Sequence, residues 1–272
     1  MNVLKRDKQR MVISLLTEGC SIRGISRITG VHQDTISRLL VRVGDHCAQI
    51  HDERMRNLQC VSVQADELWC FVAKKQRRIT PDDPWEQGDA YTFVAMDTHS
   101  KIVVSYLVGK RDEEHTRAFI DDLSQRLSGR TQLSTDGFWP YVSSVRSAFN
   151  GRVDYAMVVK SYEGGTTDDE HRYSPPRVVS TNRKWISGRP RHHLITTSHV
   201  ERQNLTCRMQ MRRFTRLTNA FSRKMANLRA AVALHFAWYN FVRIHRSLGM
   251  TPAMAQRVTD RLWKMEELLP QA

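Results

Sequence analysis

The spacing of hydrophobic residues predicts a helical N-terminal region. Apolar side chains recur every three to four positions over residues 5–17, 22–28 and 33–43, the periodicity of amphipathic helices. Ser21 is a typical capping residue before the second segment, and Gly30 supplies a turn after it. Two helices joined by a tight glycine turn, with a stabilising helix in front, are the elements of a helix-turn-helix, although an ordinary three-helix bundle has the same pattern.

The outer face of the third predicted helix carries polar and basic side chains. In a helix-turn-helix this face would reach base edges or phosphates in the major groove of DNA, whereas in a plain bundle it would only be solvated. The candidate DNA-contacting residues on this face are Gln33, Asp34, Thr35, Ser37, Arg38 and Arg42.

From residue 60 the hydrophobic period changes to two, which predicts strands. Strands are expected at 61–72, 90–97, 101–108, 131–136 and 153–159, with a crossover helix at 113–127 and a short helix after Pro140. Residues 161–192 are rich in Gly, Asp, Ser, Pro and Arg, which is typical of an insertion or flexible loop. Helices are expected at about 198–217, 219–247 and 252–268. Strands followed by crossover helices favour an α/β fold.

This pattern predicts a domain organisation. We expect a helix-turn-helix domain over 1–45, a polar helical linker over 46–59, an α/β domain over 60–250 and a C-terminal helix over 251–272. No apolar run is long enough to cross a membrane, and the N-terminus lacks the apolar core of a signal peptide. The five cysteines form no CxxC pair, which argues against a zinc finger or a disulfide framework. We therefore expect a soluble intracellular protein with no membrane partner.

Charge narrows the class of partner. The net charge is +14, and a basic excess of this size points to a polyanion, most often nucleic acid. Residues 183–259 hold 15 of the 42 Lys and Arg residues but a single acidic residue, Glu201. The excess is thus concentrated in one late segment, which is expected to lie against a phosphate backbone.

Three carboxylates stand out by position. Asp66 lies in the first predicted strand, Asp136 at the end of the fourth, and Glu201 near the start of the basic helix. Open α/β sheets place ligands at strand ends, so Asp136 in particular is expected at a site. Glu67 adjoins Asp66 but is expected on the opposite face of the strand, and Asp97 is expected to begin a hairpin turn.

The lone Glu201 admits two interpretations. It could be a salt-bridge partner for the surrounding cations, or it could complete a metal site with Asp66 and Asp136. Three carboxylates suit Mg²⁺ or Mn²⁺, which prefer oxygen ligands and keep positions open for phosphate oxygens. Two such ions together activate a nucleophilic oxygen and stabilise the leaving oxygen in a displacement at phosphorus.

Helical spacing extends this site along the basic helix. Asn204, Arg208 and Arg212 follow Glu201 on the same face, where guanidinium groups could hold DNA phosphates. The same residues could equally form a solvated basic stripe. Trp139, close to Asp136, could stack on a displaced base, but core packing explains it at least as well.

Several motifs together resemble a known family. The sequences are Asp-Glu-Leu-Trp at 66–69, Thr-Asp-Gly at 135–137 and His-Val-Glu-Arg-Gln-Asn-Leu-Thr at 199–206, and the chain from 238 to 253 resembles the closing helices of the same enzymes. They are similar to DDE-type insertion-sequence transposases, most closely to the insertion-sequence-one family. The resemblance covers most of residues 60–255. It implies an RNase H-like catalytic core, a mixed sheet flanked by helices, in which Asp66, Asp136 and Glu201 hold divalent metal.

The resemblance also implies an activity. The family cleaves DNA at insertion-sequence ends and transfers the strand into target DNA, so double-stranded DNA at inverted repeats and targets would be the partner. Synapsis of two ends implies a homo-oligomer, at least a dimer, and the resemblance implies the bacterial cytoplasm and nucleoid as the location. Two other functions remain open: a metal-dependent DNA nuclease without joining activity, and a non-catalytic helix-turn-helix regulator.

Overall fold

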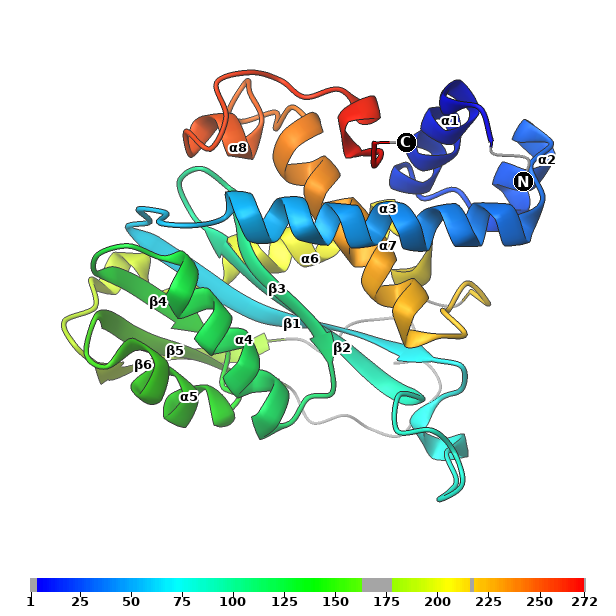
Figure 1. Ribbon diagram of the computed structural model, residues 1–272. Coiled ribbons are helices and arrows are strands. Elements are labelled where there is room, and N and C mark those ends of the chain that lie inside the picture. Colours follow the sequence, from blue (N-terminus) through cyan, green and yellow to red (C-terminus); the bar gives the residue numbers. More distant parts are fainter. Residues whose placement is uncertain (1–3, 163–177, 216–217, 272) are drawn as a thin grey trace.

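A six-stranded mixed sheet forms the centre of the protein. The computed structural model describes residues 4–162, 178–215 and 218–271, and Figure 1 shows the sheet beneath a layer of helices. The strands follow the order β3-β2-β1-β4-β5-β6. Their bounds are Ser62–Val72 (β1), Gly88–Asp97 (β2), Val103–Gly109 (β3), Thr131–Thr135 (β4), Val153–Tyr162 (β5) and Val178–Ser187 (β6). This mixed sheet with flanking helices is consistent with an RNase H-like core and confirms the predicted α/β class.

The register of β1 matters for function. This strand runs antiparallel to β2 from Val63 to Val72, but only Ser62–Ala65 pair with the parallel strand β4. Because β4 stops at Thr135, the second half of β1 extends past its neighbour. Side chains from both faces of β1 can therefore approach the end of β4.

Helices cover both faces of the sheet. On one face α4 (Glu113–Arg126) and α5 (Pro140–Phe149) pack against inward-facing residues such as Ala65 and Phe93. On the other face α6 (Ser198–Gln210) and α7 (Met225–Ala237) share a cluster that includes Leu68. Successive side chains of β1 point to opposite faces of the sheet, and both faces are covered by helices, so β1 is buried on both sides.

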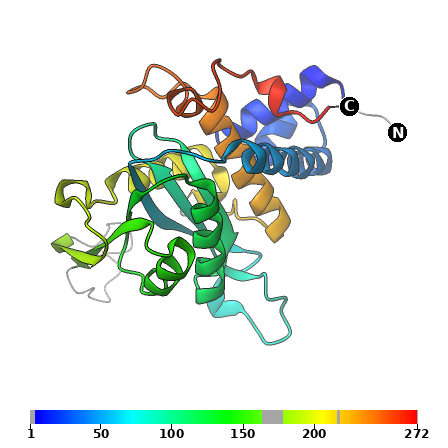
Figure 2. The ribbon, with the colours of Figure 1, turned by 60° about the vertical axis from the view of Figure 1, so that its left-hand side comes forward.

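The predicted N-terminal helices are present as α1 (Arg6–Thr17), α2 (Ile22–Thr29) and α3 (Gln33–Arg54). Ser21 caps α2 by accepting a hydrogen bond from the backbone N–H of Gly24 (3.0 Å), and Gly30 ends it with a left-handed φ of 71°. Figure 2 shows these helices at one end of the molecule and the β5–β6 strands at the other.

The expected end of the third helix was wrong. Instead of stopping near residue 43, α3 continues without a break to Arg54, through most of the segment expected to be a separate polar helical linker. Cys47 and Ile50 are buried, so the apolar face of the helix continues past residue 43. Polar residues around them make this face hard to recognise in the sequence. The helix packs so closely on α7 that a Cβ at Gly44 would lie 2.4 Å from the Cα of Ala230.

The C-terminal segments also differ from expectation. The first expected helix ends at Gln210, before a short turn at Arg212–Phe214, and the second is α7 followed by a π-helical turn at Trp238–Val242. The helix expected over 251–272 was wrong: only Pro252–Ala255 (α8) and the 3-10 turn Met265–Leu268 are helical.

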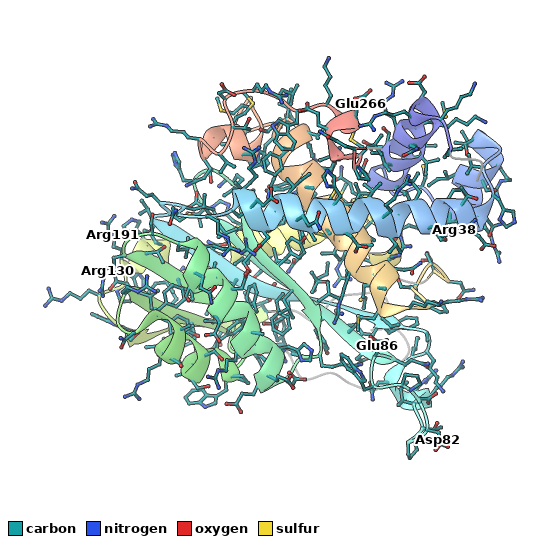
Figure 3. The ribbon with its side chains drawn as sticks, in the orientation of Figure 1. Arg38, Asp82, Glu86, Arg130, Arg191 and Glu266 are labelled. Atoms are coloured by element: carbon teal, nitrogen blue, oxygen red, sulfur yellow. The ribbon has the colours of Figure 1, made fainter. Side chains whose placement is uncertain are left out.

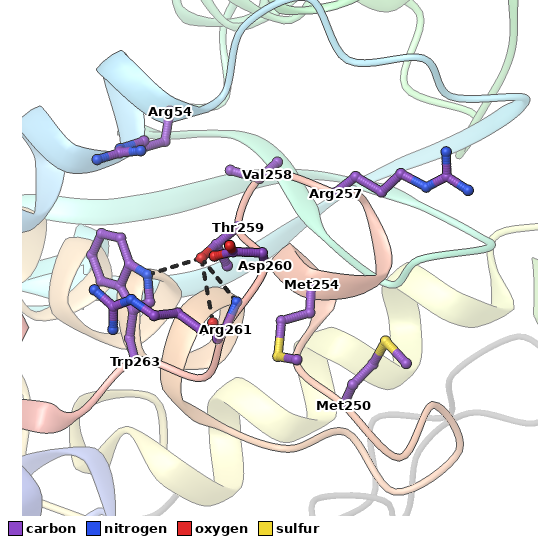
Figure 4. Close-up of a pocket in the computed structure, with 9 residues that line it drawn as sticks. All are labelled: Arg54, Met250, Met254, Arg257, Val258, Thr259, Asp260, Arg261 and Trp263. Atoms are coloured by element: carbon purple, nitrogen blue, oxygen red, sulfur yellow. Dashed lines mark hydrogen bonds between the residues drawn. The ribbon is translucent and has the colours of Figure 1, made fainter.

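Tertiary contacts explain the irregular C-terminus. Trp263 stacks on Phe241 at 4.4 Å between ring centroids, and its indole N–H donates to the Thr259 hydroxyl at 3.2 Å (Figure 4). Between Phe241 and Trp263 in the sequence, Arg257 adopts a left-handed backbone conformation with a φ of 62°, which interrupts a regular helix. A regular helix here would withdraw Trp263 from the core.

The segment expected as an insertion is partly ordered sheet. Residues 161–162 belong to β5, and Val178–Ser187 form β6, which pairs antiparallel with β5. The rest of this segment up to residue 177 lies outside the described residues. Within the described ranges, no helix has the length and apolar character needed to cross a membrane.

Candidate active site

The three carboxylates singled out from the sequence line one pocket. Its volume is about 580 Å³, and Asp66, Asp136 and Glu201 all contribute to its wall. Ala65 pairs with Thr135, so Asp66 and Asp136 are the next residues along two parallel neighbouring strands. The register therefore brings these two carboxylates together at the end of β4, where ligand sites of such sheets are found.

Helix α6 is fastened to β1 beside the pocket. The side-chain oxygen of Gln64 accepts hydrogen bonds from the backbone N–H groups of His199 (2.8 Å) and Val200 (3.2 Å), which otherwise have no partner at a helix N-terminus. One turn further on, the Asn204 amide donates to Asp66 Oδ2 at 2.8 Å. These bonds place Glu201 at the pocket, from a segment far along the chain.

Glu201 has two partners of its own at the pocket wall. Its carboxylate forms an ion pair with Lys160 of β5 and accepts a hydrogen bond from the Thr197 hydroxyl. The ion pair with Lys160 is the kind of contact that the salt-bridge interpretation of Glu201 expects. Its place on the pocket wall is equally compatible with the metal interpretation.

Glu67 completes the tightest acidic cluster instead. One carboxylate oxygen each of Asp66, Glu67 and Asp136 lie within 4.8 Å of one another. Arg111 bridges two of them, with its Nε 3.0 Å from Glu67 Oε2 and its Nη2 3.3 Å from Asp136 Oδ2. The guanidinium also lies over the Phe138 ring, 3.8 Å from its centroid.

The expectation that excluded Glu67 needs correction. Its backbone position does face the α4–α5 side of the sheet, where Tyr141 contacts it, and its side chain is only 3% exposed. The carboxylate still reaches Asp136 because β4 ends at Thr135 and no longer separates the two faces. Glu67 could have been identified from the sequence by two features: it is adjacent to Asp66, and its predicted strand is longer than the strand that ends at Asp136.

Burial and mutual repulsion perturb the cluster. Burial and the neighbouring carboxylates Glu67, Asp136 and Glu201 raise the pKa of Asp66 to about 7. Burial, together with the Asp136 charge, raises the pKa of Glu67 to about 7 as well, and burial raises the pKa of Asp136. The raised pKa values mean that Arg111 does not balance the negative charge of the three carboxylates. Clusters of carboxylates with raised pKa values are common at functional sites.

The donor set determines which cation fits. The cluster offers carboxylate oxygens alone, without His or Cys among the described residues within reach. Such oxygen-only sites favour hard ions such as Mg²⁺ or Mn²⁺ over Zn²⁺. The residues present therefore fit the predicted type of metal.

The candidate DNA-contacting residues of α3 lie on its outer side. Gln33, Asp34, Arg38 and Arg42 are exposed, while Thr35 and Ser37 are partly exposed. Figure 3 shows Arg38 projecting from the N-terminal half of the helix. This face borders a groove of about 670 Å³ whose opposite side carries Arg223 and Lys224, cations that the sequence analysis did not single out.

The basic face expected after Glu201 is only partly realised. Asn204 is buried against Asp66 rather than presented to solvent, and Arg208 is half-buried in the last turn of α6. Arg212 is exposed, but it lies beyond the end of α6 in the turn Arg212–Phe214. The expectation that these residues share one helical face was wrong for Arg212, because α6 ends at Gln210.

Comparisons with known proteins give a distant likeness. No protein-family model matches the sequence, and no curated protein matches it. The Mos1 strand transfer complex aligns over 57% of this chain and 59% of that chain, with 16% identity and a TM-score of 0.25. The paired-end complex of mariner Mos1 with Mg aligns over 55% and 58%, with 16% identity and a TM-score of 0.20.

A second kind of transposase covers more of the chain. The piggyBac synaptic complex with hairpin DNA aligns over 98% of this chain and 71% of that chain, with 10% identity and a TM-score of 0.40. The chain spans about three-fifths of the Mos1 chains that it matches. None of these matches supports the narrower resemblance to the insertion-sequence-one family. The similarity to transposase structures is distant and concerns the fold.

Proposed function

We propose that this protein is a DNA transposase, which cleaves DNA at the ends of an insertion sequence and joins the freed strand to target DNA. The observation that supports this function is the carboxylate pocket at the end of β4, built from Asp66, Asp136 and Glu201 with Glu67 beside them. The pocket lies in a chain with a net charge of +14, which favours a phosphate-rich substrate.

The proposed chemistry needs no protein nucleophile. A water molecule attacks a phosphodiester at the element end and releases a 3′-hydroxyl, which then attacks a phosphodiester of the target and displaces its 3′-oxygen. Mg²⁺ or Mn²⁺, as two ions, would supply charge neutralisation and acidify the attacking group. Asp66, Asp136 and Glu201 would hold the metal, with Glu67 as a fourth carboxylate within reach.

The surrounding residues have positioning roles in this proposal. Asn204 holds the Asp66 carboxylate in one orientation, and the backbone N–H of Phe138 donates to Asp136 Oδ1 at 3.0 Å. Arg111 forms ion pairs with Glu67 and Asp136, and Lys160 forms one with Glu201, so these two cations offset part of the negative charge of the pocket. Bound metal would supply further positive charge there, and Arg111 and Lys160, which already line the pocket, would be placed to contact a DNA phosphate.

We further propose that α2 and α3 are a helix-turn-helix that reads the element ends. Replacing Arg38 with alanine is then expected to reduce the preference for terminal inverted repeats by about 10-fold, because one good base contact contributes roughly 1–3 kcal/mol of discrimination. Competition binding of end and unrelated duplexes measures this ratio. Arg208→Ala is the comparison variant: it should weaken binding to both duplexes alike, since a phosphate contact carries no sequence information. An unchanged ratio for Arg38→Ala would argue for a plain bundle.

A joining assay separates transposase from nuclease. Labelled duplexes that end in the element's inverted repeats, incubated with Mg²⁺ and a supercoiled plasmid, are expected to yield both nicked ends and labelled plasmid. Cleaved ends without labelled plasmid would identify a nuclease, and binding without cleavage would identify a regulator. Because synapsis requires two ends, we also expect at least a dimer of the chain on DNA, which light scattering of the complex measures.

A further inference from the structure

An exposed tryptophan stands at the rim of the carboxylate pocket. The side chain of Trp139 lines the pocket together with Asp136, and it is 70% exposed, whereas Trp238 in the core is 7% exposed. The core position considered from the sequence is therefore wrong. Within the described parts of the chain, its indole makes no hydrogen bond and no ring contact. An exposed indole does not gain the free energy that burial of its large apolar surface would provide, so its ring is available to a ligand.

The backbone under this ring is well fixed. Trp139 precedes Pro140, whose ring restricts φ at the first position of α5. Its carbonyl accepts a hydrogen bond from the N–H of Val142 at 2.9 Å, and the preceding N–H, that of Phe138, donates to Asp136. The indole is thus held on a helix terminus three residues from a candidate metal ligand, and not on a loose loop.

The surroundings distinguish between possible ligands of this ring. The pocket wall carries the charged residues Arg111, Asp136 and Lys160, and two further aromatic residues, Phe138 and Tyr162, so the indole stands in a wall that mixes rings and charges. A protein partner would require a contiguous apolar patch. A nucleotide matches this wall better, because its flat base can stack on the indole and its phosphate can contact the cations and a bound metal ion.

We propose that Trp139 binds an unpaired nucleobase beside the phosphodiester that is cut. In a duplex the face of each base is covered by its neighbours, so an indole can stack on it only after that base leaves the helix. Stacking on Trp139 offsets part of this cost and holds the adjoining phosphate over Asp66 and Asp136. Trp139 is thus a positioning residue. The link to cleavage rests on the proposed function, whereas base stacking does not.

The stacking itself is tested without catalysis. In metal-free buffer, a single-stranded oligonucleotide is expected to quench the tryptophan fluorescence of the full chain. Trp139→Ala should remove most of the quenching and weaken the Kd about 10-fold, while Trp139→Phe should retain most of the affinity. Trp85→Ala is the matched control, since Trp85 is also exposed (61%) but lies outside the pocket. Equal Kd values for wild type and Trp139→Ala would overturn the proposal.

A second measurement places the base at the cleavage position. On an intact duplex end with Mg²⁺, Trp139→Ala is expected to cleave about 10-fold more slowly than wild type. On the same duplex with an abasic nucleotide at the scissile position, the two proteins should cleave equally, because there is no base to stack. A deficit that persists on the abasic duplex would identify a structural effect of the mutation and refute the proposal. If wild type cleaves neither duplex, the proposed function fails, and the fluorescence experiment still decides whether Trp139 stacks on a base.

Discussion

Replacing Asp136 with asparagine is expected to lower metal-dependent DNA cleavage by about 10³-fold or more. The substitution keeps the size of the side chain and the oxygen that accepts the N–H of Phe138, but removes a negative metal ligand. Loss of one charged group that acts on the transition state typically has an effect of this order. DNA affinity should stay within about 2-fold of wild type, because the basic surfaces are unchanged. Single-turnover cleavage and filter binding of the same labelled duplex measure the two quantities.

The matched control for this experiment is Asp82→Asn. It makes the same chemical change at an exposed residue that does not line the pocket, on the projecting loop where Figure 3 labels Asp82. We expect it to cleave as wild type does. Cleavage by Asp136→Asn within 10-fold of wild type, beside an unchanged control, would remove Asp136 from the metal site and favour a non-catalytic protein.

The metal-free protein is expected to gain stability when Asp66 is replaced by asparagine. The pKa of Asp66 is raised to about 7 in the folded protein, mainly by burial, while in the unfolded chain it returns to its ordinary value near 4. Between these values the folded state binds more protons, so this group's contribution to stability is complete below pH 4 and is lost as the pH rises through 7. Allowing for solvent at this half-buried site, the loss at pH 8 amounts to about 2 kcal/mol.

Thermal unfolding with and without Mg²⁺ measures this effect. At pH 8 without metal, Asp66→Asn should melt several degrees above wild type, and the difference should vanish near pH 4. Mg²⁺ should stabilise wild type, by about 2.7 kcal/mol at 100 times its Kd, but stabilise the variant much less. A lower melting temperature for the variant at pH 8, or equal Mg²⁺ stabilisation of both proteins, would contradict a repulsive metal-binding cluster.

Comparison of variant with wild type is essential here, because buried histidines act in the opposite direction. Burial lowers the pKa of His51 and of His235 to about 3. The unfolded chain therefore binds protons that the folded one does not, and stability from these groups is lost as the pH falls below about 6.5. Both proteins contain both histidines, so their contribution cancels in the difference between wild type and Asp66→Asn.

The local sequence pattern was sufficient for most of the secondary structure. Alternating apolar residues identified the first half of β1, and capping residues such as Ser21 and Gly30 identified the ends of α2. Asp97 was expected to begin a turn, and its carboxylate does accept hydrogen bonds from the Ser100 backbone and hydroxyl (both 2.7 Å). These features depend on interactions within a few residues, which a sequence displays directly.

Part of the site was predictable for the same reason. Asp136 follows a short predicted strand and Asp66 lies on another, and both were singled out as metal ligands; the parallel pairing of β1 with β4 in the structure brings them together. The sequence by itself thus determined the α/β class, the basic surface of the chain and two carboxylates at a strand end. These follow from periodicity and charge, which are properties of the chain before it folds.

Only the tertiary structure decided the rest. The early end of β4 lets Glu67 join the cluster from the opposite face, and the fastening of α6 to Gln64 brings Glu201 next to Lys160. The same packing leaves Trp139 exposed and extends α3 across α7. Each outcome depends on which segments, distant in sequence, come into contact, and the free energy of such contacts is carried by surfaces that do not exist until the chain has folded.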